Sequence, residues 1–170
     1  MSGVRVLVGT KKGAFVLTAD GKRDKWNIAG PFFGGWEIYH LKGSPADPNR
    51  LYASQTSGWF GQLLQRSDDG GKSWATVNAE PNVNPRPFYF GELRVDPQDP
   101  NRVYSVDYNL RVSTDGGKTF RNAVRGDEIH GDHHAMWIDP NDPEHFVHGD
   151  DGGVAVTADG GKTNRFVSNL

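Results

Sequence analysis

The 170 residues carry 19 lysines and arginines against 21 acidic residues, a formal net charge of −2, so no basic surface predicts binding to nucleic acid or an anionic membrane. Cysteine is absent, which excludes disulfides and thiolate chemistry, and no apolar run approaches the roughly 18 residues of a spanning helix. With 22 glycines, 10 prolines and no recognisable leader, we expect a cytoplasmic domain of many short strands, or a secreted one if a leader was removed.

The predicted strands follow one order along the chain. The first three lie at residues 5–8, 13–17 and 25–29, and three longer units then begin near Trp36, Phe88 and His133. Each longer unit reads as strand A, Asp-Pro turn, strand B, loop, strand C, Asp-Gly-Gly turn and strand D. The first unit begins at strand B, so fifteen strands are expected, and strand A is missing from the first unit.

Two turn phrases repeat along the chain. The Asp-Pro phrase reads SPADPNRLY at 44–52, DPQDPNRVY at 96–104 and DPNDPEHFV at 139–147. The Asp-Gly-Gly phrase reads SDDGGKSW at 67–74, STDGGKTF at 113–120 and TADGGKTN at 157–164, with a looser TADG at 18–21. Its aspartates at 20, 69, 115 and 159 are 49, 46 and 44 residues apart. Four strands in a period near 45 residues are typical of a β-propeller blade.

The chemistry of both phrases predicts turns rather than reactive groups. Proline lacks the amide donor that a strand ladder needs, and glycine permits positive φ. The Ser/Thr hydroxyl and the Asp carboxylate can accept from turn amides, and the closing aromatic should pack back into the sheet. The residues given this structural role are Ser67, Asp69, Gly71, Trp74, Ser113, Asp115, Gly117, Phe120, Thr157, Asp159 and Gly161.

The fold class predicted is all-β, with propeller blades of four antiparallel strands and about 3.75 blades in one domain. The domain covers residues 1–170, with blades at 4–30, 36–80, 88–126 and 133–170. A β-sandwich is the alternative fold, but sandwich strands do not normally share repeated turn phrases. Open rings expose strand edges, so we expect a homo-oligomer that completes a propeller ring; a compact four-bladed ring is the competing arrangement.

These phrases resemble the signature S-x-D-x-G-x-[ST]-[WF] of the BNR or Asp-box repeat superfamily, which includes sialidases, xyloglucan-hydrolase-like proteins and sortilin-type receptor domains. The signature is complete in the copies at 67–74 and 113–120, while Asn164 replaces the aromatic in the last copy. Residues 1–80, with GWEIYHLKGSP at 35–45, resemble the compact sialidase-like group. Residues 88–170, with GDHHAMWIDP at 131–140, resemble larger glycosyl-hydrolase-type members, which suggests a hybrid or truncated parent. The resemblance implies a propeller, and it leaves catalysis open because the Asp box is structural in most members.

Antiparallel connectivity separates the loops onto two faces. The A–B and C–D turns should share one face, and the irregular B–C and D–A loops the other, which we call the loop face. Ligand-binding candidates on the loop face are Trp36, Trp59, Phe60, Tyr89 and His134. Trp59 and Phe60 lie in a longer B–C loop, where they can contact a sugar or a protein partner, or simply plug the end of the blade.

Metal-type side chains are densest at residues 130–134. Alternation along a strand would put His133 and His134 on opposite faces, so both cannot easily bind one metal. His130 with Asp132 or His134 is a weak zinc candidate, and a polar strand start explains the same residues. Residues 150–153 read as a calcium loop or as a glycine turn. No cofactor is therefore assigned.

A glycosidase needs two carboxyl groups about 5–10 Å apart across the scissile bond. The loop-face candidates are Glu37, Asp132, Asp150 and Asp151. A sialidase is disfavoured because no arginine cluster and no F/Y-R-I-P phrase is found. We therefore predict a non-catalytic propeller module that binds a carbohydrate or protein on the loop face, with a BNR-type glycoside hydrolase as the alternative.

Overall fold

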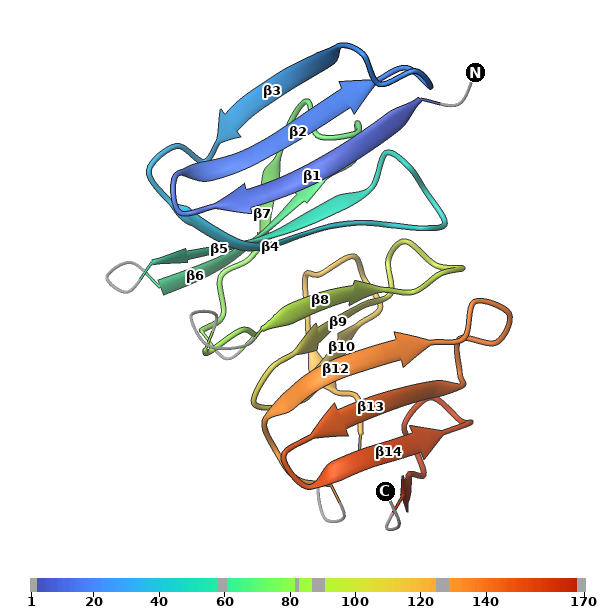
Figure 1. The fold of residues 1–170 in the computed structure, drawn as a ribbon. Helices are drawn as coiled ribbons and strands as arrows, with labels where there is room; N and C mark the ends of the chain where they lie inside the picture. The colour runs from blue at the N-terminus through green and yellow to red at the C-terminus, as the bar shows by residue number, and fades with distance from the viewer. Residues whose placement is uncertain (1–2, 58–60, 82, 87–90, 125–128, 168–170) are drawn as a thin grey trace.

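The computed structural model describes residues 3–57, 61–81, 83–86, 91–124 and 129–167, which form fifteen strands in four antiparallel sheets (Figure 1). Blade 1 holds β1 (Val4–Thr10), β2 (Gly13–Ala19) and β3 (Trp26–Phe32). Blade 2 holds β4 (Glu37–Gly43), β5 (Leu51–Ser57), β6 (Gly61–Ser67) and β7 (Ala75–Asn78). Blade 3 holds β8 (Glu92–Val95), β9 (Val103–Val106), β10 (Leu110–Ser113) and β11 (Arg121–Asn122). Blade 4 holds β12 (His133–Ile138), β13 (Phe146–Asp150), β14 (Gly153–Thr157) and β15 (Arg165–Val167).

The four blades follow one another in a row, and the predicted all-β partial propeller is confirmed. In every sheet the strands pair in chain order, and the sheets of blades 1 and 4 are not hydrogen-bonded to each other. Strands β1, β4, β8 and β12 contact their neighbours in that order, while the chain ends lie at opposite ends of the row (Figure 1). No helix among the described residues has the length and apolarity to cross a bilayer.

Each Asp-Gly-Gly turn is fastened by its own side chains, as expected. In blade 3, Asp115 Oδ1 accepts from the N–H groups of Lys118 and Thr119, both at 3.0 Å. The Ser113 hydroxyl accepts from Gly117 N–H at 2.8 Å, and the turns at 67–74 and 157–164 repeat the pattern. In blade 4, the backbone N–H and the hydroxyl of Thr163 lower the pKa of Asp159 to about 2. These carboxylates therefore stabilise turns.

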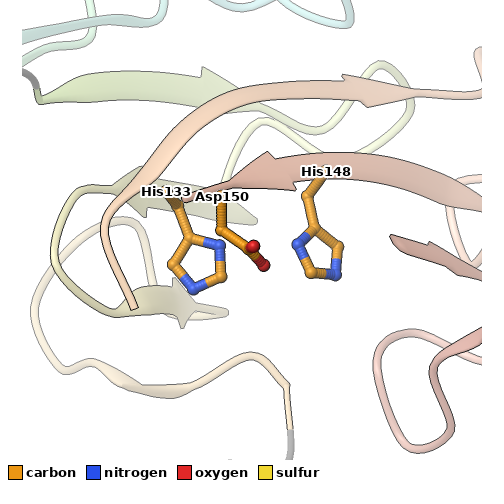
Figure 2. Close-up of side chains that lie close together, drawn as sticks. All are labelled: His133, His148 and Asp150. Atoms are coloured by element: carbon orange, nitrogen blue, oxygen red, sulfur yellow. The ribbon is translucent and has the colours of Figure 1, made fainter. Parts of the chain in front are cut away.

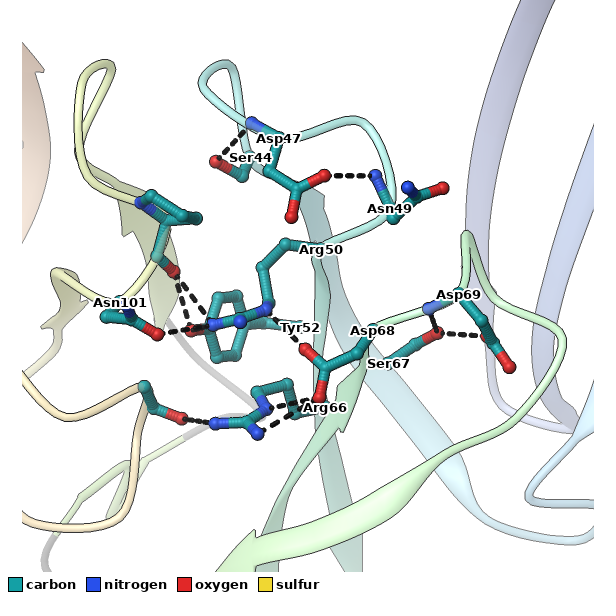
Figure 3. Close-up of polar contacts among 12 residues, drawn as sticks. Ser44, Asp47, Asn49, Arg50, Tyr52, Arg66, Ser67, Asp68, Asp69 and Asn101 are labelled. Atoms are coloured by element: carbon teal, nitrogen blue, oxygen red, sulfur yellow. Dashed lines mark hydrogen bonds and ion pairs between the residues drawn. The ribbon is translucent and has the colours of Figure 1, made fainter.

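The two kinds of turn lie side by side on one face. The Gly70 N–H donates to the Asn49 carbonyl at 2.9 Å, which joins the Asp-Gly-Gly turn of blade 2 to its Asp-Pro turn. The same 2.9 Å bond recurs from Gly116 to Asn101 and from Gly160 to Glu144. Figure 3 shows both turns of blade 2 close together. The irregular loops therefore share the opposite face, as the connectivity predicts.

The second glycine of each Asp-Gly-Gly turn packs against the preceding blade. A Cβ on Gly71 would lie 2.9 Å from Val16 of blade 1, and one on Gly117 would lie 2.8 Å from Leu64 of blade 2. The closing aromatics pack into their own sheet, as expected, and also against the preceding blade, because each lies in an apolar cluster that the two blades share. Trp74 meets Phe33 of blade 1 edge-on, with ring centroids 5.3 Å apart. The turn is therefore a joint between blades as well as a hairpin.

Polar side chains reinforce the same joints. The Arg50 guanidinium donates to the Asn101 side chain of blade 3 at 2.8 Å, and the Tyr52 hydroxyl donates to the Pro100 carbonyl at 2.8 Å (Figure 3). Between blades 3 and 4, Arg102 pairs with Glu144 at 2.6 Å. The apolar core is likewise divided into clusters between neighbouring sheets.

Candidate functional site

The loop face is best defined where blade 3 meets blade 4. The B–C turn of blade 3 carries Tyr108, and the segment before β12 carries Asp132, whose φ of 60° is left-handed. The N–H groups of Asp132 and His133 donate to the carbonyls of Tyr108 and Asp107, both at 2.9 Å. These bonds fix the start of β12 against the preceding blade.

The buried side chain of Asp107 holds the loops of this junction together. Its side chain is fully buried and accepts from the N–H groups of Tyr108 and Arg86. Burial raises the pKa of this carboxyl. Arg86 in turn pairs with Asp132 at 3.0 Å and lies over the Tyr108 ring, 4.9 Å from its centroid. Asp107 and Asp132 are thus both occupied in holding loops.

A cavity of about 220 Å³ opens beside this junction. We call it the loop-face cavity; it is lined by Tyr108, Asn109, Leu110, Asn122, Val124, Ile129, His130, Gly131 and His133. Tyr108 is 45% exposed, so an aromatic edge and two amide side chains are available to a ligand. Such a mixture of aromatic and neutral polar groups suits a small polar ligand.

Three buried polar side chains meet behind the cavity. His133, on β12, is 3% exposed; His148 and Asp150, on β13, are 1% and 9% exposed. Figure 2 shows the two imidazoles flanking the Asp150 carboxylate, with one nitrogen of each ring turned toward it. Burial, followed by the neighbouring His148, lowers the pKa of His133 to about 4, and burial also lowers the pKa of His148. Both rings are therefore neutral at pH 7.

A β-bulge brings these residues together. Met136 pairs with His148 and Ala135 with Gly149, but the register then shifts so that His133, rather than His134, pairs with Asp150. His133 consequently faces the same side as His148, and His134 turns outward to pair with Asp151 at 2.7 Å. Sequence reasoning separated His133 from His134 correctly but missed His148, whose only signal was its place two residues before Asp150.

The other predicted site residues do not gather at one point. His130 is exposed and its Nδ1 lies 2.8 Å from the Gly131 carbonyl, while Asp132 is paired with Arg86, so the weak zinc set of His130, Asp132 and His134 is dispersed. Trp36 lies in the loop between β3 and β4, where its backbone N–H donates to the Phe33 carbonyl at 3.0 Å. Trp59, Phe60 and Tyr89 lie outside the described residues.

The hydrolase candidates are similarly occupied. Glu37 begins β4 in blade 2, whereas Asp132, Asp150 and Asp151 lie at the junction of blades 3 and 4. Asp150 Oδ1 accepts from the amides of Gly152 and Gly153 at 2.8 and 3.1 Å, which supports the glycine-turn interpretation of residues 150–153. Three of the four carboxylates thus hold local structure in the part of the chain that the structure describes.

No protein-family model and no curated protein matches the chain, whereas solved structures do. The GH74 enzyme of Niastella koreensis is 20% identical with a TM-score of 0.70, over 96% of this chain and 28% of the enzyme. YCF48 bound to D1 peptide is 11% identical with a TM-score of 0.54, over 98% and 57%. The lectin BP39L of Burkholderia pseudomallei is 16% identical with a TM-score of 0.53, over 96% and 51%. These similarities establish the β-propeller fold, and the chain spans under a third of the GH74 enzyme.

Proposed function

We propose that this chain is a non-catalytic propeller module that binds a carbohydrate-type ligand at the loop-face cavity. The proposal rests on how polar side chains are used at the junction of blades 3 and 4. The carboxylates hold loops, through Asp132 to Arg86 and Asp151 to His134, whereas neutral polar and aromatic groups line the cavity. A ligand rich in hydroxyl groups matches Asn109, Asn122 and the edge of Tyr108.

The similar structures support ligand binding by this fold without choosing the ligand. BP39L is a lectin, and YCF48 is described with a peptide bound. We favour carbohydrate because the cavity is small and neutral, while an extended peptide commonly adds to a free strand edge or fills a longer groove. A protein ligand is the outcome that the experiment must separate.

The test is binding to a glycan array, followed by ligand-observed NMR with the wild type, two cavity variants and one control variant. Tyr108→Ala and Asn109→Ala should weaken binding about tenfold or more, because each removes a cavity contact. Lys118→Ala, on the opposite face, is the matched control and should bind normally. Glycan binding unaffected by both cavity variants would contradict the site, and hydrolysis of chromogenic glycosides lost in Asp132→Asn or Glu37→Gln would favour the hydrolase.

We further propose that two copies associate head to tail, blade 4 of one against blade 1 of the next. The row Leu7, Val16 and Ala29 of blade 1 faces blade 2, so the alternate row Val6, Leu17 and Ile28 faces away from it. Ile28 is 66% exposed and Val6 is 41% exposed. This leaves an apolar sheet face with no neighbouring blade in the chain.

Blade 4 offers the complementary surface. Aligning Asp69 with Asp159, an offset of 159 − 69 = 90, places Val156 and Val167 at the positions of Arg66 and Val77. In blade 2 those two positions contact the Asp-Gly-Gly turn of blade 3, at Gly116 and Gly117. In blade 4 they line a groove of about 530 Å³. In blade 2 these positions are covered by the next blade of the chain. Blade 1 of a second copy would cover the equivalent positions of blade 4 in the same way.

Light scattering over a micromolar concentration series tests the association. The wild type should show a mass above 18.7 kDa that rises with concentration, and Ile28→Glu should shift it toward the monomer. Lys118→Glu, an exposed charge reversal away from both surfaces, should leave the mass unchanged. A monomeric wild type throughout the series would refute the proposal.

A further inference from the structure

Three buried polar atoms without hydrogen-bond partners meet in blade 4. They are Nδ1 of His133, Nδ1 of His148 and Oδ2 of Asp150. The ligand-type atoms of these residues lie within 4.8 Å of one another. Leaving even one such group unsatisfied is costly, and folded proteins rarely do so without a bound partner or a functional reason.

In His148 and Asp150 the other polar atom of the side chain already has a hydrogen-bond partner. That partner indicates whether the remaining atom is a donor or an acceptor. His148 Nε2 lies 3.4 Å from the Asn164 side-chain oxygen, an acceptor that favours the tautomer with the ring proton on Nε2 and the lone pair on Nδ1. Asp150 Oδ1 is held by the amides of Gly152 and Gly153, which leaves Oδ2. His148 Nδ1 and Asp150 Oδ2 are therefore acceptors, and a neutral His133 offers a third lone pair at Nδ1 when its ring proton is on Nε2. Acceptors that converge in this way suit a cation.

We propose that His133, His148 and Asp150 bind one divalent transition-metal ion, for which Zn²⁺ is the matching probe. Two neutral imidazoles and one carboxylate are a ligand set that zinc and non-haem iron sites share. Some point lies within about 2.8 Å (4.8/√3) of one ligand atom from each of the three residues, so rearrangements below ~1 Å reach the ~2.0–2.1 Å of a zinc–nitrogen bond. Because His133 also lines the loop-face cavity, the proposed site adjoins that cavity.

The ligand set is peculiar to blade 4. Aligning the Asp-Pro phrases places Ala53 and Ser105 at the position of His148. The repeat architecture therefore does not require a histidine there. The partner of His148 is exceptional too, because Asn164 stands where blades 2 and 3 have Trp74 and Phe120. The far N–H of a ligating histidine is usually held by an oxygen acceptor outside the metal's ligand set, and the Asn164 side-chain oxygen is placed to take that role.

The test is Zn²⁺ binding to the whole chain, purified with a chelator and then dialysed free of it. Isothermal titration should give one Zn²⁺ per chain, and Co²⁺ should give visible d–d absorption bands from nitrogen ligation. Zn²⁺ at a hundredfold excess over its Kd should raise the Tm by about 5–10 °C. None of these measurements depends on ligand binding at the cavity, so they stand apart from the proposed function.

Variants distinguish this site from surface histidines. His148→Gln and Asp150→Asn should each weaken Zn²⁺ binding at least tenfold, and Asn164→Ala should weaken it about 10–100-fold through loss of the support to His148. His134→Gln, the adjacent histidine that faces outward, is the matched control and should bind like the wild type. Far-UV circular dichroism verifies that each variant is folded.

Either of two results would overturn the proposal. One is a wild-type chain that binds no Zn²⁺ at 100-fold molar excess and shows neither a Tm shift nor Co²⁺ bands. The other is binding that His134→Gln removes while His148→Gln keeps. If His148→Gln does not fold, the Co²⁺ spectrum of the wild type and the comparison with Asn164→Ala still decide the matter.

Discussion

Adjacent glycines in the last Asp-Gly-Gly turn test whether the turn is a joint between blades. Gly160 and Gly161 have φ values of 70° and 88°, so alanine is strained at both, by about 1–2 kcal/mol. Their surroundings differ. A Cβ on Gly160 would meet the end of the Glu144 side chain, which can move aside, whereas one on Gly161 would meet the backbone carbonyl of Ala123 in blade 3.

The backbone contact adds an overpacking cost of about 1–3 kcal/mol to Gly161→Ala only. We therefore expect Gly160→Ala to lose about 1–2 kcal/mol of unfolding free energy and Gly161→Ala about 2–5 kcal/mol. Urea unfolding followed by circular dichroism, at one fixed protein concentration, measures both. Equal losses, within about 0.5 kcal/mol, would show that positive φ alone matters and would refute the joint.

The remaining predictions concern turn chemistry, pH and the core. Asp115→Asn should destabilise the chain by about 1–3 kcal/mol, because an amide replaces a carboxylate that accepts two backbone N–H groups; urea unfolding would contradict this if the loss were below about 0.3 kcal/mol. Asp159, with its pKa lowered to about 2, contributes stability above pH 4 that is lost as pH falls toward 2, so the Tm should drop over that interval and drop less in Asp159→Asn. Burial, then Arg94, lowers the pKa of His40 to about 4, so the unfolded state binds the extra proton and stability should fall from pH 6.5 to 4; His40→Asn should flatten that slope. Phe146→Ala, at a side chain with no exposed surface, should cost about 3–5 kcal/mol in the same unfolding experiment, and a cost below 1 kcal/mol would contradict the assigned core.

The turns were predictable because their chemistry is local. Asp69 bonds to atoms two to four residues away, so its role is contained within one phrase of the sequence. The spacing of such phrases then indicates four-stranded units, and antiparallel connectivity places both kinds of turn on one face. The joint between Trp74 and Phe33 was not predictable, because it depends on how one blade lies on another.

The repeat, the strand order and the face on which the loops gather follow from the amino-acid pattern alone, since each depends on short-range turn geometry and alternation. Which side chains meet on that face depends on the folded arrangement of the strands. His133 and His148 come from different strands, and a one-residue bulge at His134 selects His133 as the inward ring. Because a one-residue shift exchanges the two faces of a strand, simple alternation along the sequence does not show where such a bulge lies.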